Sequence, residues 1–379
     1  MGTAPSVSAP RCAALVALAA VLAACGGGNG AANQTHSPVA STTPAHQSPT
    51  AQPTTTSGQP PPVTMPYGVL YSSQAAGTYT VSIIGIDGKV AASADVSTPP
   101  ITSCASSAAA VVAPPLSMSN SRVYFMDAQG VVHFLAPSGD TGRAASVPAP
   151  SASQRAMFAV SPDDSRIAVV VDNFTASGAS TRLYVEDVNG GGNHLDLFSE
   201  SGSSSLWPIG WHGTNNLVLA VTPSCTQGGG PFCCGPQELH VVDPATATRR
   251  FTIGSKGGCV VAGPPSAGGV VCENRPDFTS GSVLNWTAGT VRTLAFNGPA
   301  SSYLSPEGSM VMFVDNTGTG FTLGAGAISG FFACTWIDGT HVMSGGDSQH
   351  QPRVAEITTQ AMVPVPAQGD CAGRLPGGL

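Results

Sequence analysis

The sequence predicts an all-β protein: a β-propeller of about seven four-stranded blades, closed into a ring by its C-terminal segment. Three observations support this fold class. After residue 66, short runs rich in β-branched and aromatic residues alternate with clusters of Gly, Pro, Asn and Asp, and helical periodicity is nearly absent. A strand–turn–strand unit recurs along the chain. Seven such units divide residues 67–379 into pieces of about 45 residues, the usual length of a four-stranded blade.

The recurring unit is clearest in two places. "FAVSPDDSRIAVVVD" begins at Phe158 and "YLSPEGSMVMFVD" begins at Tyr303, each with an apolar strand, a polar turn and a second apolar strand. Looser copies begin at Ile209, Cys334, Cys259 and Ala110. In most copies a second pair of strands follows, as in "RLYVEDVNGGGNHLDLF". One unit therefore supplies one blade, and a ring of units buries faces that a single unit leaves exposed.

The first and last segments of the domain complement each other. The first unit contains three strands, in "GVLYSSQ" and "YTVSIIGIDGKVAASADV", and no strand precedes them. The chain ends on an unpaired run, "CAGRL", from Cys371 to Leu375. We expect this run to form the innermost strand of the first blade, which joins the ends of the ring and removes its free edges. Because the repeats are weak, the number of blades stays open between six and eight.

Two adjacent carboxylates in the clearest unit, Asp163 and Asp164, are predicted to shape a turn. Pro162 presets φ at the second position of a type I turn, and the neighbouring side chains can accept hydrogen bonds from the backbone. The equivalent places in other units hold Glu307-Gly308, Asp338-Gly339, Pro265-Ser266 and Asn215-Asn216. A catalytic pair would not recur as turn residues around a ring, so a structural role is favoured.

These turn sequences resemble a known repeat. "SPDDSRIAVVV" and "SPEGSMVMFV" are similar to the SPDG-x-x-[IL]-[AV]-[FY] repeat of TolB-type, WD40-like (PD40) β-propellers. Two units match well, two loosely, and the other three only by their strand pattern. The resemblance implies a propeller that is often located in the cell envelope and often serves as a protein-binding platform. It implies no catalytic residue.

Residues 1–24 are predicted to be a lipoprotein signal peptide. Arg11 precedes an apolar run, "CAALVALAAVL", which is too short to span a bilayer. "LAAC", from Leu22 to Cys25, is followed by "GGG" and resembles the lipobox of bacterial lipoproteins. Cys25 would carry the lipid and become the N-terminus, and several acyl chains would hold the protein at the cell membrane, outside the cytoplasm. The alternative is an ordinary signal peptide with an incidental cysteine.

Residues 25–66 are predicted to be a disordered tether. They are rich in Ser, Thr, Pro, Gly, Gln and Ala and contain no Asp, Glu, Lys or Arg. Such a segment cannot bury enough apolar surface to offset the entropy lost on ordering. Its Ser/Thr/Pro composition is also compatible with O-glycosylation. The domain that the tether would hold off the membrane is the propeller, residues 67–379.

The charge pattern excludes one class of partner. Charged residues make up 9% of the chain, the formal net charge is −7, and Lys89 and Lys256 are the only lysines. No basic patch is present, so nucleic acid is not an expected partner. After the signal peptide, no apolar stretch reaches the length of a membrane-spanning helix.

Eight cysteines remain beyond the signal peptide and the lipid site, and an even set in an exported chain predicts disulfides. With a hairpin turn centred on Pro265-Ser266, Cys259 faces Cys272 across two strands. In the loop "CTQGGGPFCCGPQE", we expect Cys225 to pair with Cys233 or Cys234, and a strained Cys233–Cys234 bond is an alternative. A metal site is the weaker alternative there because no second C-x-x-C pair occurs and His240 is the only nearby histidine.

Three further cysteines fall near the starts of innermost strands. Cys104, Cys334 and Cys371 belong to the second, seventh and first units, which adjoin in the ring. A bond such as Cys104–Cys371 would therefore lock the closure of the ring. By the chain-entropy argument, a long loop closed in this way contributes on the order of 4 kcal/mol.

Catalytic motifs are missing from the sequence. It contains no G-x-S-x-G, P-loop, G-x-G-x-x-G, H-E-x-x-H or D-x-D-x-D-G pattern, and the histidines are dispersed. We expect no metal or other cofactor. The repeated position of Trp211 and Trp336 favours blade packing over a recognition surface, with Trp207 and Trp286 as the other tryptophans.

The resulting function hypothesis is a non-enzymatic binding or scaffolding protein of the cell envelope, with a protein or a cell-wall glycan as its partner. The alternative is a propeller hydrolase or lyase, whose site would assemble at the mouth of the central channel from residues far apart in the sequence.

Overall fold

The computed structural model describes most of one compact unit, Ser57–Leu379. The described residues are 59–73, 77–102, 115–175, 178–224, 232, 238–255, 257–261, 263–274, 278–296, 301–322, 326–346 and 349–379. They contain 28 β-strands and no helix, which confirms the all-β class. Among them, no helix is long and apolar enough to cross a membrane.

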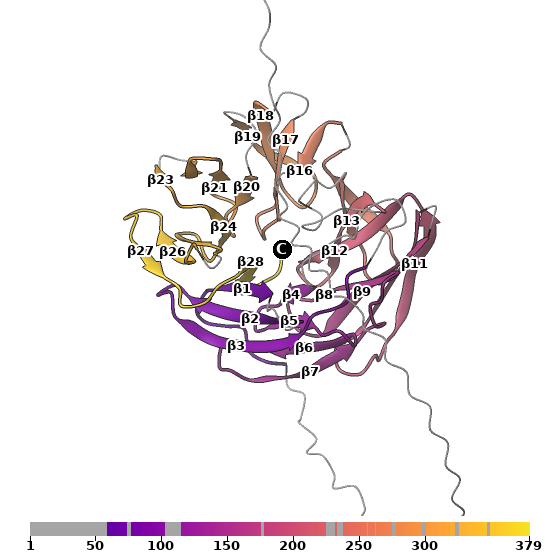
Figure 1. The fold of residues 1–379 in the computed structure, drawn as a ribbon. Helices are drawn as coiled ribbons and strands as arrows, with labels where there is room; N and C mark the ends of the chain where they lie inside the picture. Colours follow the sequence, from indigo (N-terminus) through magenta and orange to yellow (C-terminus); the bar gives the residue numbers. More distant parts are fainter. Residues whose placement is uncertain are drawn as a thin grey trace, which may run out of the picture. The chain divides into compact units, whose positions relative to one another are not determined.

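The strands form seven antiparallel four-stranded sheets, the blades of a propeller (Figure 1). From the innermost to the outermost strand, blade 1 comprises β28 (Asp370–Leu375), β1 (Tyr67–Ser73), β2 (Thr78–Gly85) and β3 (Val90–Ser97). In the same order, blade 2 comprises β4 (Leu116–Met118), β5 (Val123–Met126), β6 (Val131–Leu135) and β7 (Thr141–Ser146). Blade 3 comprises β8 (Gln154–Val160), β9 (Arg166–Thr175), β10 (Gly178–Asp187) and β11 (Leu195–Gly202).

The remaining blades also run from the innermost to the outermost strand. Blade 4 comprises β12 (Ser204–His212), β13 (Asn216–Pro223), β14 (Glu238–Val242) and β15 (Arg249–Ile253). Blade 5 comprises β16 (Cys259–Val261), β17 (Val270–Asn274), β18 (Ser280–Leu284) and β19 (Thr290–Ala295). Blade 6 comprises β20 (Ser301–Leu304), β21 (Val311–Val314), β22 (Gly318–Phe321) and β23 (Ala327–Ser329). Blade 7 comprises β24 (Ala333–Trp336), β25 (His341–Ser344), β26 (Arg353–Glu356) and β27 (Met362–Pro364).

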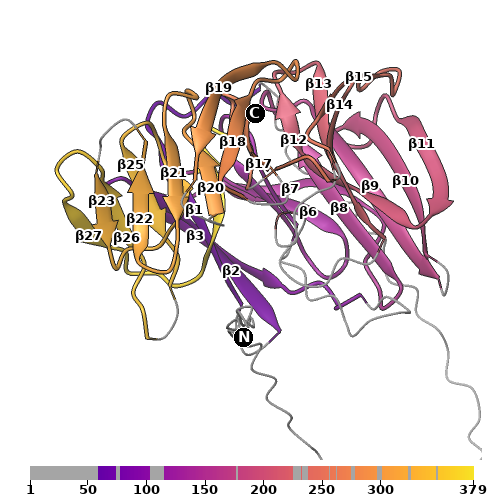
Figure 2. The same ribbon diagram turned by 90° about the horizontal axis from the view of Figure 1, so that it is seen from above.

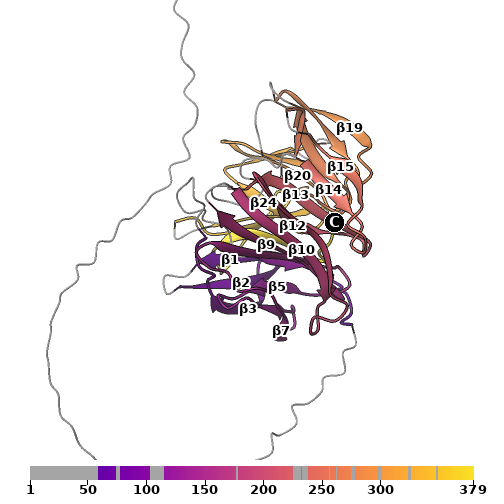
Figure 3. The ribbon, with the colours of Figure 1, turned by 90° about the vertical axis from the view of Figure 1, so that its right-hand side faces the viewer.

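The C-terminal strand closes the ring, as the sequence predicted. Strand β28 pairs antiparallel with β1, and Leu375 lies opposite Tyr67. It also contacts β24 of blade 7 and β4 of blade 2, so it joins the last blade to the first. The blades follow one another around a centre where the C-terminus lies (Figure 1). Seen from above, β27 and β11 lie at opposite ends (Figure 2), and seen from the right-hand side, so do β3 and β19 (Figure 3).

Apolar side chains between neighbouring blades form the core. Strand β9 shows how the sequence achieves this, because successive side chains of a strand point to opposite faces. Ile167 and Val169 pack in the cluster shared with blade 2, whereas Ala168 and Val170 pack in the cluster shared with blade 4. A strand with both faces buried must be apolar throughout, which explains the continuous run "IAVVV".

Trp211 and Trp336 pack between blades, as their repeated position predicted. Each lies at or near the end of the innermost strand of its blade and is at most 3% exposed. The Trp211 indole donates a hydrogen bond to the Ala159 carbonyl of blade 3 at 3.0 Å. The Trp336 indole donates one to the Tyr303 carbonyl of blade 6, also at 3.0 Å. A buried indole N–H thus finds a partner in the preceding blade.

Contacts of the propeller begin before β1, within the residues assigned to the tether. The Val63 amide donates a hydrogen bond to the Asn120 carbonyl at 2.9 Å, and the Val63 side chain packs against the core between blades 1 and 2. The Gln59 side-chain amide donates one to the Asp163 carbonyl. The segment from residue 59 onward therefore lies against the propeller.

Candidate functional site

The two adjacent carboxylates have structural roles, and the roles differ. Asp163 shapes the turn: its Oδ1 accepts hydrogen bonds from the Ser161 and Ser165 hydroxyls at 2.6 and 2.8 Å. Burial raises the pKa of the Asp163 carboxyl, but these hydrogen bonds outweigh burial and hold it below its usual value. Asp164 is 7% exposed and accepts hydrogen bonds from the Ser121 and Tyr124 hydroxyls of blade 2, both at 2.7 Å. It therefore joins blades 2 and 3.

A disulfide closes the ring between blades 7 and 1. Cys334 of β24 is bonded to Cys371 of β28, with the two Cα atoms 5.7 Å apart. A disulfide was expected to join the ends of the ring, and this one does. The predicted Cys104–Cys371 pairing, however, is wrong. The reason is that β24 lies beside β28, so Cys334 is the cysteine within reach of Cys371. The sequence placed three cysteines near innermost strands but did not show which two of them are close together.

Cys259 and Cys272 form the predicted disulfide of blade 5, with a Cα–Cα distance of 5.2 Å. The predicted turn is wrong by two residues, because it lies between Ser266 and Gly269 rather than at Pro265-Ser266. Cys272 therefore lies opposite Val261, and the disulfide joins a diagonal pair. The other predicted site residues lie outside the described residues: Cys25, Cys104, Cys225, Cys233 and Cys234.

A cavity of about 320 Å³ lies between the innermost strands. Its lining is largely apolar and aromatic, with Trp207, Trp211, Tyr303 and Trp336 contributed by three blades. Arg374 is the one charged side chain among the described lining residues. No group of three His, Cys, Asp or Glu side chains in the described part of the chain is arranged to hold a metal ion.

The C-terminal residues cross this cavity. The Gly377 amide donates a hydrogen bond to the Ser119 carbonyl at 2.6 Å, and the Leu379 amide donates one to the Trp211 carbonyl at 2.8 Å. The Arg374 guanidinium donates to the Pro376 carbonyl at 2.7 Å. Burial lowers the pKa of Arg374, and the more distant Glu307 and Asp338 oppose that shift. The arginine thus helps to hold the final residues across the ring.

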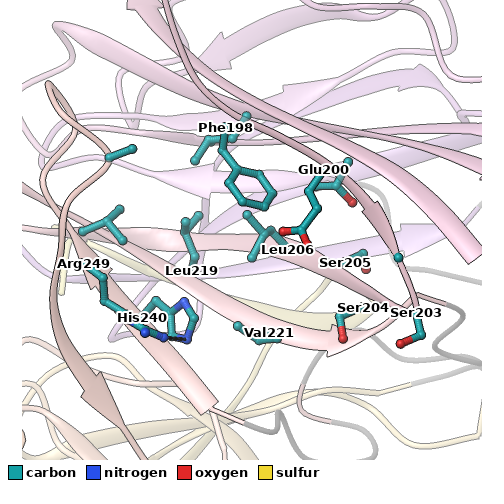
Figure 4. A pocket seen from close by; sticks show the side chains of 15 residues that line it. Phe198, Glu200, Ser203, Ser204, Ser205, Leu206, Leu219, Val221, His240 and Arg249 are labelled. Carbon is teal, nitrogen blue, oxygen red and sulfur yellow. Dashed lines mark hydrogen bonds between the residues drawn. The ribbon is translucent and has the colours of Figure 1, made fainter.

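A larger groove of about 500 Å³ lies between blades 3 and 4 (Figure 4). Strands β10 and β11 supply one wall, and β12 to β15 supply the other. The surface is mainly apolar, formed by Leu183, Phe198, Leu206, Leu219, Val221 and Val242. Its volume lies within the range of ordinary ligand sites.

Charged groups lie on opposite sides of this blade 3–4 groove. Glu200 of β11 is exposed on one side, and Arg249 and His240 lie on the other (Figure 4). The Glu238 Oε1 lies 2.5 Å from His240 Nε2, and Arg249 Nη1 lies 3.0 Å from the same nitrogen. Arg249 Nη1 also lies 3.8 Å from Glu238 Oε1, so the groove has an apolar interior, Glu200 on one side and the Arg249–Glu238 pair on the other.

Strand β11 adds a second feature to the groove. Among the described strands it pairs only with β10, so its other edge has unpaired backbone N–H and C=O groups. The strand is eight residues long and contains no proline or lysine, two residues that commonly block edge pairing.

Sequence reasoning missed the residues of this groove. The strands of blades 3 and 4 that carry Phe198, Glu200, His240 and Arg249 were predicted, but not which of their faces meet. The contributing residues span Thr181 to Arg249 and come together only because the two blades are neighbours. No pattern in the sequence indicated which faces of the two units meet.

Comparisons with known proteins identify no family for this chain. No protein-family model matches the chain, and no curated protein sequence matches it. Among solved structures, it is similar to dihydro-heme d1 dehydrogenase NirN in complex with DHE. That match has a TM-score of 0.46 and 13% sequence identity, and it covers 82% of this chain and 75% of the other. A likeness at this level says nothing about the site.

Proposed function

We propose that the protein is a lipid-anchored, non-enzymatic binding protein of the cell envelope, and that its partner is an extended protein segment seated in the blade 3–4 groove. The observation that carries this proposal is the combination of an apolar groove with the open edge of β11. An extended peptide can add a strand to such an edge, while the groove receives its alternate side chains.

The chemistry of the groove favours a peptide over a polar small molecule. Backbone hydrogen bonds to β11 provide affinity, and apolar side chains over Phe198 and Leu206 provide specificity. Glu200 and Arg249 lie on opposite sides, so a peptide with charges of both signs around an apolar residue complements both.

The anchor and the location rest on the sequence. The lipobox-like "LAAC" before Gly26 supports Cys25 as the lipidated residue, and the charge-free segment after it supports a tether at the outer side of the cell membrane. The PD40-like turns support a protein-binding platform in the envelope. The alternative hydrolase or lyase needs carboxylate or histidine side chains at the channel, and the described lining of the central cavity offers neither to favour it.

Selection from a library of extended peptides tests the groove. The full-length protein should enrich peptides that have an apolar residue between charged residues of both signs. Phe198→Ala should weaken the affinity of a selected peptide by about ten-fold, because it removes the aromatic wall. The matched control is Phe251→Ala, since Phe251 is 36% exposed on β15 and does not line the groove. Equal affinity of both variants would overturn the proposal.

Metabolic labelling with a palmitate analogue tests the anchor separately. The wild-type protein should incorporate label and sediment with membranes. Cys25→Ala should lose both properties and should keep its affinity for a selected peptide. Label on the Cys25→Ala protein would contradict lipidation at this residue.

A further inference from the structure

We infer that a second groove, between blades 1 and 7, binds an uncharged carbohydrate chain. This groove has a volume of about 750 Å³ and is separate from the blade 3–4 groove. The polar side chains that line it are five hydroxyls and three amides: Ser72, Ser73, Thr80, Ser82, Ser93, Gln349, Gln351 and Gln368. None of its described lining side chains is charged.

The hydroxyls come from one face of blade 1. On β2, Tyr79, Val81 and Ile83 pack in the core shared with blade 2. Thr80 and Ser82 alternate with them and face the opposite side, toward blade 7. Cross-strand pairing extends this polar face, because Ser72 lies opposite Thr80 and Ser93 lies opposite Ser82.

Packing between blades does not account for this polar face. Farther along the same face, Leu70 and Ile84 pack against Ile337 and Met343 of blade 7 in an ordinary apolar core. The switch from these residues to serine and threonine opens the groove instead of filling it. Two hydroxyls that are buried between other blades each have a carboxylate partner, as Thr181 has Asp172 and Ser302 has Glu273.

Ser82 points most directly to a ligand. It is 4% exposed and lines the groove, and its hydroxyl makes no hydrogen bond with any residue that the structure describes. The Ser82 oxygen opens onto the groove and is not fully buried, so it can donate to and accept from a ligand hydroxyl there. The Gln351 side chain already makes one hydrogen bond within the protein, because its Nε2 donates to the Val365 carbonyl at 3.3 Å.

The composition of the groove selects the class of ligand. Hydroxyls and primary amides both donate and accept hydrogen bonds, which matches sugar hydroxyls that also do both. An anionic ligand would find no counter-ion in this lining, and the adjacent Asp95 carboxylate, which accepts a hydrogen bond from Thr80, would repel it. The volume suits several sugar rings better than a single ion or water-sized molecule.

Calorimetric titration of the full-length protein with neutral oligosaccharides tests the inference. The probes are glucan, galactan, mannan and chitin fragments, with polygalacturonate as the charged comparison. At least one neutral series should bind, with affinity that rises with chain length. Absence of binding by every neutral series, or equal binding of polygalacturonate, would overturn the inference.

Variants locate the binding. Ser82→Ala with Ser93→Ala should weaken the affinity about ten-fold, through two lost hydrogen bonds, with an unchanged midpoint of thermal unfolding. The control is Ser180→Ala on β10, the strand of blade 3 that corresponds to β2. Phe198→Ala should also leave oligosaccharide affinity unchanged, which separates this site from the proposed peptide groove. Undiminished binding by the double variant, or competition by a selected peptide, would contradict the assignment.

Discussion

Asp163 and Asp164 are adjacent, yet one stabilises a single turn and the other joins two blades. Asp164 has a φ of 60°, a left-handed conformation that aspartate tolerates better than most residues. This conformation directs its carboxylate at two hydroxyls of the preceding blade. The sequence correctly indicated a structural role through the turn residues around it. It did not indicate the second role, because Tyr124 is 40 residues away in the chain.

Removing the Asp164 carboxylate should cost more stability than removing its neighbour. Asp164→Ala leaves the Ser121 and Tyr124 hydroxyls buried without their partner, so we expect the free energy of unfolding to fall by about 3 kcal/mol. Asp163→Ala should cost about 1 kcal/mol, since solvent reaches its turn more easily. Denaturant unfolding of both variants measures the difference. Equal losses would contradict the interblade role of Asp164.

A turn glutamate should contribute to stability in a pH-dependent way. Hydrogen bonds from Thr358 and Thr359 lower the pKa of Glu356 from 4.5 to about 2. Since the folded-state pKa is the lower one, the contribution is fully present above pH 4.5 and is lost as the pH falls toward 2. Glu356→Gln should therefore flatten the decline of the free energy of unfolding over this window. Glu200→Gln is the matched exposed control and should leave this decline as it is in the wild type. A decline in Glu356→Gln equal to that of the control would contradict the assigned role of Glu356.

At the scale of elements, the sequence pattern predicts which strands pair within a blade. It does not predict which strands of neighbouring blades lie side by side. The alternation of apolar runs and turn residues located the strand pairs of each blade. It placed the turn of blade 5 at Pro265-Ser266, two residues too early, because the turn runs from Ser266 to Gly269, where a φ of 123° suits glycine. The pairing of Cys334 with Cys371 also could not be predicted from the sequence, because it depends on β24 lying beside β28.

The two described disulfides should differ in their effect on the closing strand. Cys334→Ser with Cys371→Ser opens a loop of 37 residues, for which the chain-entropy model gives about 4 kcal/mol of lost stability. It should also speed amide exchange in β28. Cys259→Ser with Cys272→Ser, which opens 13 residues, should cost about 3 kcal/mol and leave β28 exchange unchanged. Peptide mapping without reduction checks the pairings first, and a different partner for Cys371 would contradict them.

At the scale of the whole molecule, the ring depends on its last strand. The closure of the ring was predictable, because the first unit lacks one strand, and the repeated strand pattern predicted about seven blades but left six to eight open. The grooves were not predictable, because each lies between faces of two blades, and no pattern within one blade specifies what the neighbouring face presents.

Removal of β28 should open the ring. A chain that ends before Asp370 leaves the inner edge of β1 unpaired and exposes the core that holds Leu375, so it should lose cooperative thermal unfolding and aggregate. A chain that ends at Leu375 keeps the strand and should retain a cooperative transition at a lower midpoint, because only the contacts of residues 376–379 are lost. A cooperative transition in the shorter chain would show that β28 is dispensable.

The most direct measurement of the proposed function is hydrogen exchange of the full-length protein with and without a selected peptide. Addition of a strand to blade 3 predicts slower exchange at those amides of β11 that point away from β10, because they gain backbone partners from the peptide. Exchange in β19, the outermost strand of blade 5, should stay the same because β19 does not line the groove. Protection confined to β11 and the blade 3–4 groove would support peptide binding there. Peptide binding that leaves β11 exchange unchanged would contradict it.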